Sequence, residues 1–213
     1  MKIPYRQSFG EEVANAVSHG AMALLALCFI PVAAVVAYAR GNAGDAAAIS
    51  VFSISIFLMF LGSALYHAMA QDSKHKEIFR ILDHSFIYVA IAGSYTPIAL
   101  SVLGGWQGWL IFAIQWTMVI FGILQKALSS HKIMKPSLAI YLIMGWTVVI
   151  FFPLFIAKAQ LGLQLLLLAG GLFYTAGVLF YVLDRRYPWM HGVWHLFVLA
   201  GSTCHYVAIL FYV

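Results

Sequence analysis

The sequence contains very little charge for its length. Only 9% of its 213 residues are Asp, Glu, Lys or Arg, whereas a soluble domain carries about 25% charged residues. A soluble fold of this size would therefore have too few polar groups to cover its apolar surface. The chain is also poor in cysteine, and both cysteines, Cys28 and Cys204, lie inside apolar runs. Their placement excludes a disulfide-stapled secreted scaffold.

What the chain does contain is long apolar runs. Hydrophobic residues make up 63% of it, which excludes intrinsic disorder. A transmembrane helix needs about 20 mostly apolar residues, and charged or glycine-rich breaks separate seven runs of that length. We therefore predict an all-α membrane protein in which residues 1–213 form one seven-helix bundle. The predicted spans are residues 17–38, 46–70, 81–103, 106–125, 136–157, 161–183 and 190–213.

Prolines fall inside three of these spans. Pro31, Pro97 and Pro153 lie within the first, third and fifth spans, respectively. Proline is tolerated in transmembrane helices where neighbouring helices satisfy the freed backbone groups. We expect kinks at these positions, within continuous spans.

The basic residues indicate how the bundle is oriented. A net charge of +5 could point to nucleic acid, but the basic residues are scattered and form no stripe, so no nucleic-acid partner is expected. Only Arg40 and Lys158 fall in the odd-numbered loops. The remaining basic residues lie in the N-terminal tail and the even-numbered loops: Lys2, Arg6, Lys74, Lys76, Arg80, Lys126, Lys132, Lys135, Arg185 and Arg186. By the positive-inside rule, the N-terminus is predicted to be cytoplasmic and Val213 to be outside.

Eight histidines stand out in a chain that otherwise avoids ionisable groups. Such residues are costly inside a membrane and indicate function. His191 and His195 open the seventh span at positions i and i+4, so they share one helix face and can bind one metal ion. The second span ends with Ser63 and His67, which are also one turn apart, and Asp83 opens the third span.

These five residues are predicted to share one depth in the membrane. The C-terminal end of the second span and the N-terminal ends of the third and seventh spans face the same side. Three imidazoles with a nearby carboxylate match a catalytic Zn²⁺ site that keeps an open position for water. In such a site Asp83 would act as general base, and Ser63 or the zinc would polarise the attacked carbonyl. If Asp83 ligates directly, the site closes and a structural zinc is indicated instead.

The other histidines are assigned lesser roles. His19 lies at the cytoplasmic end of the first span and His84 adjoins Asp83, so both are candidates to support the metal ligands from outside. His205 lies deeper on the face of His191, where it either packs in the core or lines a cavity beneath the metal. His75 and His131 fall in basic loops, where solvent exposure is expected.

The motifs taken together resemble the hemolysin III family, the bacterial branch of the progestin and adipoQ receptors, and more distantly the alkaline ceramidases. The resemblance covers nearly the whole chain. It is carried by Glu11, the Asn15-Ala-Val-Ser-His19 segment, Ser63-x-x-x-His67, Asp83-His84-Ser85, the Ala92–Pro97 segment and His191-x-x-x-His195. The resemblance implies a bundle with a cytoplasmic N-terminus in the bacterial inner membrane. It also implies a zinc ion held by His67, His191 and His195, with its water held by Asp83 and with Ser63 beside it.

These observations favour a metal-dependent hydrolase of lipid-like amides, because the site is predicted to lie just below the headgroups of the inner leaflet. The expected partner is a membrane lipid, as substrate, and no sequence pattern sets an oligomeric state. Two alternatives stay open. One is a sensor or receptor in which zinc only organises the bundle, and the other is a pore-forming cytolysin, which the family name suggests.

Overall fold

The structure is a computed structural model that describes residues 6–128 and 135–213. The described residues form α-helices with two irregular helical segments and contain no strand. Within these described ranges, seven spans are long and apolar enough to cross a membrane, which confirms the predicted class and number of spans. The α-helices are α1 (Phe9–Arg40), α2 (Ala43–Ala68), α3 (Lys74–Pro97), α4 (Gly105–Leu128), α5 (Lys135–Gly145), α6 (Phe152–Lys158), α7 (Leu161–Leu183) and α8 (Met190–Tyr212).

Two helices begin seven or more residues earlier than the predicted spans because polar residues cap them. The first span was predicted at 17–38, but α1 begins at Phe9. The Ser8 side chain accepts from the Glu11 amide, and the Glu11 carboxylate accepts from the Ser8 amide at 2.8 Å. This capping box satisfies backbone donors that would otherwise lack partners. In the same way α3 begins at Lys74, seven residues before the predicted start, because Ser73 Oγ accepts from the Lys76 amide.

The fifth span is not one continuous helix, contrary to the prediction for residues 136–157. α5 ends at Gly145, a 3₁₀ segment covers Thr147–Phe151, and α6 begins at Phe152 with Pro153 in its first turn. Proline has no amide hydrogen, so the α-helical bonding pattern cannot pass through it. The Tyr95 hydroxyl donates to the Gly145 carbonyl at 2.7 Å and accepts from the Val148 amide at 2.9 Å. The Tyr95 side chain, which comes from α3, thus satisfies backbone groups that the break in the fifth span leaves free.

The other two prolines have smaller effects. α1 continues through Pro31 without a break, as expected. Pro97 ends α3, and the third span continues as a π-helical segment, Ile98–Leu103. The span therefore stays continuous, but its hydrogen-bonding pattern changes at the proline.

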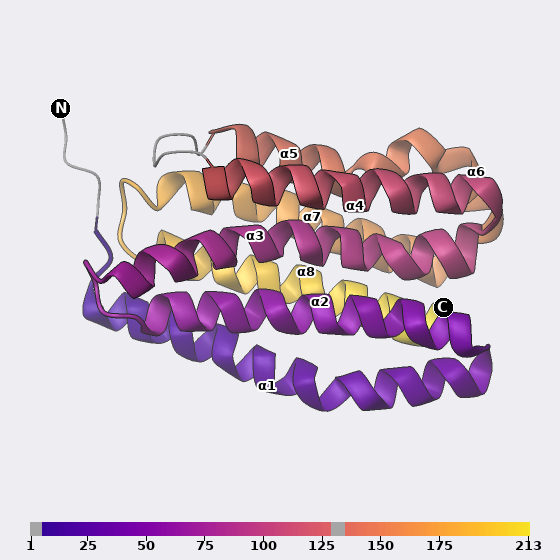
Figure 1. The fold of residues 1–213 in the computed structure, drawn as a ribbon, viewed down its shortest axis with the longest axis horizontal. Coiled ribbons are helices and arrows are strands. Elements are labelled where there is room, and N and C mark those ends of the chain that lie inside the picture. The colour runs from indigo at the N-terminus through magenta and orange to yellow at the C-terminus, as the bar shows by residue number, and fades with distance from the viewer. Residues whose placement is uncertain (1–5, 129–134) are drawn as a thin grey trace.

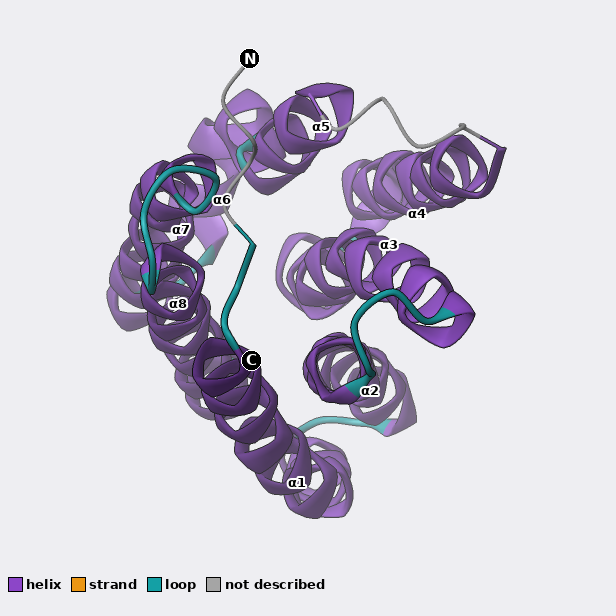
Figure 2. Ribbon diagram, turned by 90° about the vertical axis from the view of Figure 1, so that its left-hand side faces the viewer, coloured by secondary structure: helices purple, strands orange, loops and turns teal. Residues whose placement is uncertain are grey.

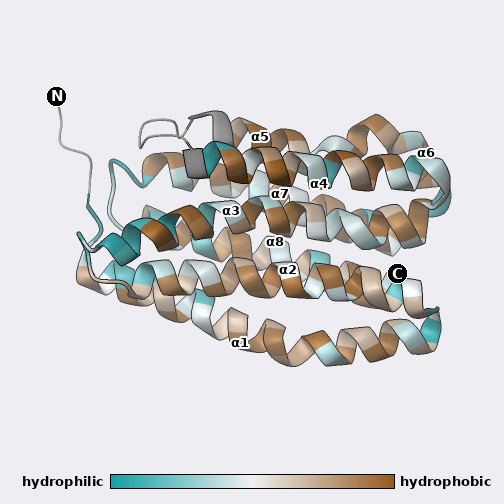
Figure 3. Cartoon of the chain, viewed as in Figure 1, coloured by the Kyte–Doolittle hydropathy of each residue, from teal (hydrophilic) through white to brown (hydrophobic). Residues whose placement is uncertain are grey.

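Figure 2 shows the helices of the bundle from the end that lies on the left in Figure 1. Figure 2 shows α7, α8 and α1 in a curved row that faces α2, α3 and α4, and α1 packs against both α2 and α8. α3, α5 and α8 begin at the same end of the bundle as α2, α4 and α7 end, on the left in Figure 1. We call this the histidine end. Figure 3 shows hydrophilic residues at the start of α3 and hydrophobic residues along the middle of the helices.

Close packing brings α2 against α3 near the histidine end. Gly62 and Ser63 of α2 are both buried. A Cβ atom on Gly62 would lie 2.5 Å from the Phe86 ring of α3, which is too close for a side chain of any size. Glycine here lets α2 approach α3 one residue before Ser63, which positions Ser63 beside the first turns of α3.

Candidate metal centre

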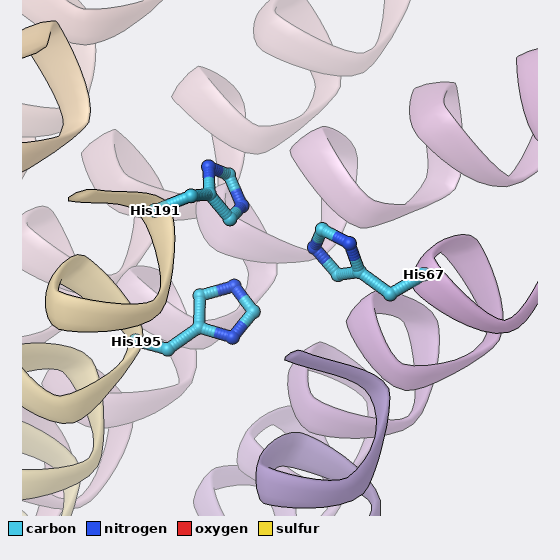
Figure 4. Close-up of side chains that lie close together, drawn as sticks. All are labelled: His67, His191 and His195. Atoms are coloured by element: carbon cyan, nitrogen blue, oxygen red, sulfur yellow. The ribbon is translucent and has the colours of Figure 1, made fainter. Parts of the chain in front are cut away.

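Three histidines that are far apart in the sequence meet at the histidine end. His67 comes from the last turn of α2, whereas His191 and His195 come from the first two turns of α8. One ring nitrogen of each lies within 4.8 Å of those of the other two. Figure 4 shows the three side chains converging from the two helices on one point. The structure therefore brings together the three residues that the sequence predicted as metal ligands.

Two of these rings are each held by a carboxylate. The Nδ1 atom of His67 lies 2.7 Å from Glu12 Oε2, and the Nδ1 atom of His191 lies 2.8 Å from Asp184 Oδ2. A carboxylate accepts a hydrogen bond, so Nδ1 carries the proton and Nε2 keeps its lone pair. This arrangement of carboxylate, imidazole and metal is typical of metal-binding histidines, because it fixes the ring and makes the ligand nitrogen more basic.

The remaining nitrogens of the cluster fit a metal as well. Nε2 of His67 and both ring nitrogens of His195 are buried and make no hydrogen bond within the described part of the chain. Buried polar atoms without partners are rare in folded proteins and call for a ligand, an ion or a water. Because two of the three rings have their second nitrogen fixed by an acid, the group fits a cation bound by three neutral imidazoles.

Glu12 and Asp184 are functional candidates that the sequence analysis missed. Glu12 precedes the predicted first span of 17–38, and Asp184 follows the sixth span, so both were assigned to segments outside the membrane. Two features of the sequence could have indicated such a role: the scarcity of acidic residues, for both, and the distance from His19, for Glu12. The chain has only seven acidic residues, and a spacing of seven places Glu12 near the helix face of His19. The contact to His67 of another helix depends on tertiary structure.

The surroundings of Glu12 and Glu11 tie the start of α1 to the site. Glu12 also accepts a hydrogen bond from Lys76 Nζ at 2.8 Å, so its charge is balanced from α3. Glu11 accepts from the Trp189 amide at 2.5 Å. Trp189 has φ of 65° directly before α8, a conformation that is uncommon for residues other than glycine. The capped first turn of α1 thus holds both His67 and the turn that leads to His191.

Asp83 and Ser63 lie beside the three histidines but outside the group of converging ligand atoms. Both side chains are buried, and the Ser63 hydroxyl is within hydrogen-bonding reach of the Asp83 carboxylate. Both line the same cavity as His191. Among the described residues, the converging ligand atoms belong to the three histidines and to no carboxylate. Three protein ligands with an acid nearby is the composition of a site that keeps a position open.

The supporting histidines lie in different surroundings. The buried ring of His19 stacks on His195, with 3.6 Å between the ring centroids and 10° between the planes. His84 donates from Nδ1 to the Arg80 carbonyl, and this same nitrogen lies 3.6 Å from Asp83 Oδ2. His205 lines the cavity at a deeper level and packs against the Tyr174 ring. His19 therefore contacts a candidate ligand, whereas His84 contacts the candidate base.

Two histidines were predicted to lie in loops. His75 is exposed, as predicted, but it belongs to the first turn of α3. His131 lies outside the residues that the structure describes.

A cavity of about 540 Å³ adjoins the cluster. At the histidine end it is lined by Ser63, Asp83 and His191, and it extends inward to Trp146, Tyr174 and His205. The ten residues from His195 to His205 correspond to about 15 Å along α8. Apolar and aromatic side chains provide most of the deeper wall, so the cavity suits a long apolar group with a polar end beside Asp83.

Comparison with known proteins identifies the family. The haemolysin-III-related family matches residues 7–206, which includes every residue of the cluster and its supporting acids. The chain belongs to this family. It is 40% identical over 204 residues to "Hemolysin-3" of Bacillus cereus, covering 95% of this chain and 92% of the relative. It is 37% identical over 203 residues to "Hemolysin-3 homolog" of Bacillus subtilis (strain 168), covering 95% and 94%.

The haemolysin-III-related chain is also similar to a human protein. It is 30% identical over 170 residues to "Monocyte to macrophage differentiation factor" of Homo sapiens, covering 75% of this chain and 67% of the relative. The family membership predicted from the motifs is therefore confirmed, and with it a multi-pass membrane protein. The inner membrane and the cytoplasmic N-terminus stay predictions.

Proposed function

We propose that this haemolysin-III-related protein is a zinc-dependent hydrolase that cleaves lipid-like amides. The observation that carries the proposal is the group of three imidazoles whose ligand atoms lie within 4.8 Å of one another, beside a buried Asp83 in an apolar cavity. Nε2 of His67, Nε2 of His191 and one ring nitrogen of His195 would hold the ion. Three neutral nitrogen ligands leave the full charge of the ion available for chemistry.

The chain's own residues would perform the proton transfers. When bound, zinc supplies a Lewis acid that polarises oxygen atoms and makes water a better nucleophile. The Asp83 carboxylate lies in the same cavity and can accept a proton from the attacking water and return it to the leaving amine. The Ser63 hydroxyl, within reach of Asp83, can donate to that carboxylate or to the oxygen of the attacked carbonyl. Glu12 and Asp184 would hold two ligand rings in place.

The cavity supports a lipid as the substrate. Its polar residues gather at the histidine end, and its deeper wall is mostly apolar. An amide with a long acyl chain would place the chain in the cavity and the carbonyl beside Asp83. Because the acyl chain of a membrane lipid already lies in an apolar medium, the apolar wall would select and orient the chain by packing, without a gain from removing methylene groups from water.

The experiment measures metal content and hydrolysis in the same preparations. We expect about one zinc per purified chain by elemental analysis and release of fatty acid from an N-acyl lipid in mixed micelles. Asp83→Asn should keep the zinc and lose at least about a hundredfold in rate, because it removes the general base. Asp72→Asn, an exposed acid near the same end, serves as the control. A chain without zinc, or an Asp83→Asn variant with full activity, would contradict the proposal.

The names of the bacterial relatives support cell lysis as a second candidate. A pore that depends on the metal-held bundle would release a dye from liposomes only when zinc is bound. Leakage that persists after chelation would show that pore and metal site are unrelated. A sensor, the third class, would show a ligand-dependent change in the bundle without any fatty acid release.

A further inference from the structure

Polar side chains also line the cavity far from the three converging histidines. His205 of α8 and Tyr174 of α7 both line it, and their rings pack edge to face with 5.3 Å between the centroids. A Cβ atom on Gly170, one turn before Tyr174, would lie 2.3 Å from the His205 ring, so only glycine leaves room for the imidazole there. The backbone of α7 and the Tyr174 ring thus fix the imidazole on two sides.

The ring nitrogens of His205 lack partners. Both are buried, and neither makes a hydrogen bond within the described part of the chain. The Leu167 carbonyl of α7 lies near the ring and can accept from one nitrogen at most. In a neutral imidazole the other nitrogen is then an acceptor without a donor. Because such an atom is costly inside a protein and within a membrane, the ring calls for a ligand atom or a water that donates to it.

The hydroxyl of Tyr174 can supply the complementary hydrogen bond. It lies 2.8 Å from Oγ of the buried Ser202, and either oxygen can be the donor. Two hydroxyls have two hydrogens and use only one of them in this bond. When Ser202 donates, the Tyr174 hydrogen stays available to an oxygen in the cavity. His205 and Tyr174 together can therefore accept one hydrogen bond from a ligand and donate another.

The distribution of charge along the cavity selects the kind of ligand group. In the described part of the chain, the charged side chains that line the cavity lie toward the histidine end: Arg80, Asp83, Lys126 and Asp184. A carboxylate or ammonium group beside His205 would therefore lack a counter-ion, which is costly at this depth in a membrane. A hydroxyl is neutral and both donates and accepts, so it matches His205 and Tyr174.

We propose that His205 and Tyr174 bind a hydroxyl group on the acyl chain of the substrate, so that the preferred substrates are amides of hydroxylated fatty acids. This inference rests on the proposed hydrolase function and names its substrate class. The carbonyl would lie beside the three histidines, and His205 lies about 15 Å from His195 along α8. A fully extended chain advances about 1.2 Å per bond, so the hydroxyl is expected near the twelfth carbon.

The test compares two lipids that differ in one oxygen atom. N-stearoylethanolamine and its analogue with a hydroxyl on the twelfth carbon share the acyl chain and the amide. Binding to the zinc-loaded full chain in detergent micelles is measured by displacement of a fluorescent fatty acid, and hydrolysis is measured in parallel. We expect the wild-type chain to bind the hydroxylated lipid about three- to tenfold more tightly, because the plain chain leaves the buried polar groups unpaired. Equal affinities, as expected if only a water donates to His205, would overturn the proposal.

Variants assign that preference to the two side chains. His205→Phe keeps an aromatic ring and Tyr174→Phe removes only a hydroxyl, and each should lower the ratio of the two affinities. Thr203→Ala removes an exposed hydroxyl from the same helix as His205 and should leave the ratio unchanged. Thermal unfolding checks that each variant is folded, and His205→Leu is the second variant at that site, should the phenylalanine variant unfold. A ratio unchanged in both phenylalanine variants would overturn the proposal.

The parallel measurements separate this inference from the proposed function. If the hydroxylated lipid binds with a preference that depends on His205 but neither lipid is cleaved, the hydroxyl site stands and the hydrolase proposal fails. If both lipids are cleaved and bind equally, the hydrolase stands and the hydroxyl site fails.

An analogue with the hydroxyl on the second carbon tests the depth of the site. Its hydroxyl would lie beside the amide, far from His205. The ratio of its affinity to that of N-stearoylethanolamine should therefore be the same in His205→Phe as in the wild-type chain. A ratio that falls in His205→Phe as much as for the twelfth-carbon analogue would overturn the assignment of the hydroxyl to the deep end of the cavity.

Discussion

At the scale of single residues, the site depends on how each imidazole is held. His67 and His191 each donate from Nδ1 to a carboxylate, and the His195 ring is held by stacking on His19. The three ligand candidates thus have three different supports, and each support comes from outside the ligand motif itself. Substitution of a supporting residue is expected to weaken metal binding while all three candidate ligands remain. Substitution of a candidate ligand is expected to abolish binding, so the two kinds of variant can be distinguished.

Glu12→Gln is expected to weaken zinc binding by about 10- to 100-fold, because loss of the carboxylate lowers the basicity of His67 and frees its ring. Competition with a chelator of known affinity measures the change. Glu77→Gln, an exposed acid on α3, is the matched control and should bind zinc like the wild-type chain. An affinity for Glu12→Gln equal to that of the control would show that the Glu12 contact does not support the site.

His19→Phe tests whether His19 only stacks on the His195 ring or also binds the metal. If His19 only packs on His195, phenylalanine keeps the ring contact and the zinc content should stay near one per chain. His19→Ala removes the ring and should lower the free energy of unfolding by about 2–5 kcal/mol, as for other large-to-small changes in a core. Elemental analysis and thermal unfolding provide the two readouts. Loss of zinc from His19→Phe would instead identify His19 as a ligand.

At the scale of elements, helix ends and helix breaks position the site. The capping box at Ser8 extends α1 far enough to bring Glu12 to His67, and Ser73 extends α3 far enough to bring Lys76 to Glu12. In the fifth span, the break between α5 and α6 is supported by Tyr95 of α3. Polar side chains thus let backbone groups end or turn within the bundle.

Tyr95→Phe is expected to destabilise the protein by about 0.5–1.5 kcal/mol, because it leaves the Gly145 carbonyl and the Val148 amide without their hydroxyl partner. Thermal unfolding in detergent micelles measures the loss. Tyr187→Phe removes an exposed hydroxyl and serves as the control. If both variants unfold at the wild-type temperature, the hydroxyl of Tyr95 does not support the break in the fifth span.

At the scale of the whole molecule, the direction of the bundle decides which leaflet the site meets. Among the described residues, most basic side chains belong to segments at the histidine end, including Lys76, Arg80 and Lys126 near the site. The positive-inside rule predicts that this end faces the cytoplasm. The proposed substrate would then enter from the inner leaflet.

Topology reporters test this orientation. Alkaline phosphatase, which is active only outside the cytoplasm, should be inactive when fused after Gln71 at the histidine end and active when fused after Asn42 at the opposite end. A green fluorescent protein fusion at the same two positions provides the reciprocal control. Activity in the reverse pattern would place the metal cluster at the outer leaflet and contradict the predicted orientation.

The sequence by itself determined the class of fold, and it predicted the three histidines that the structure brings together. Hydrophobic runs of about 20 residues can cross a membrane only as helices, so the number of spans followed directly from them. His191 and His195 share a face because of helical periodicity. His67 and Asp83 could be placed at the same depth because successive spans alternate in direction. These inferences use only the periodicity of a helix and the alternating direction of successive spans.

Only the tertiary structure decided which residues support the candidate ligands. Glu12 contacts His67, which is 55 positions away in the sequence. Hydrophobicity places Glu12 outside the first span, because the residues that form the helix cap around it are polar. The break in the fifth span is supported by Tyr95 of another helix, whose hydroxyl satisfies backbone groups at the break. The low charge of the chain marks the few ionisable groups as significant, but packing decides which of them meet.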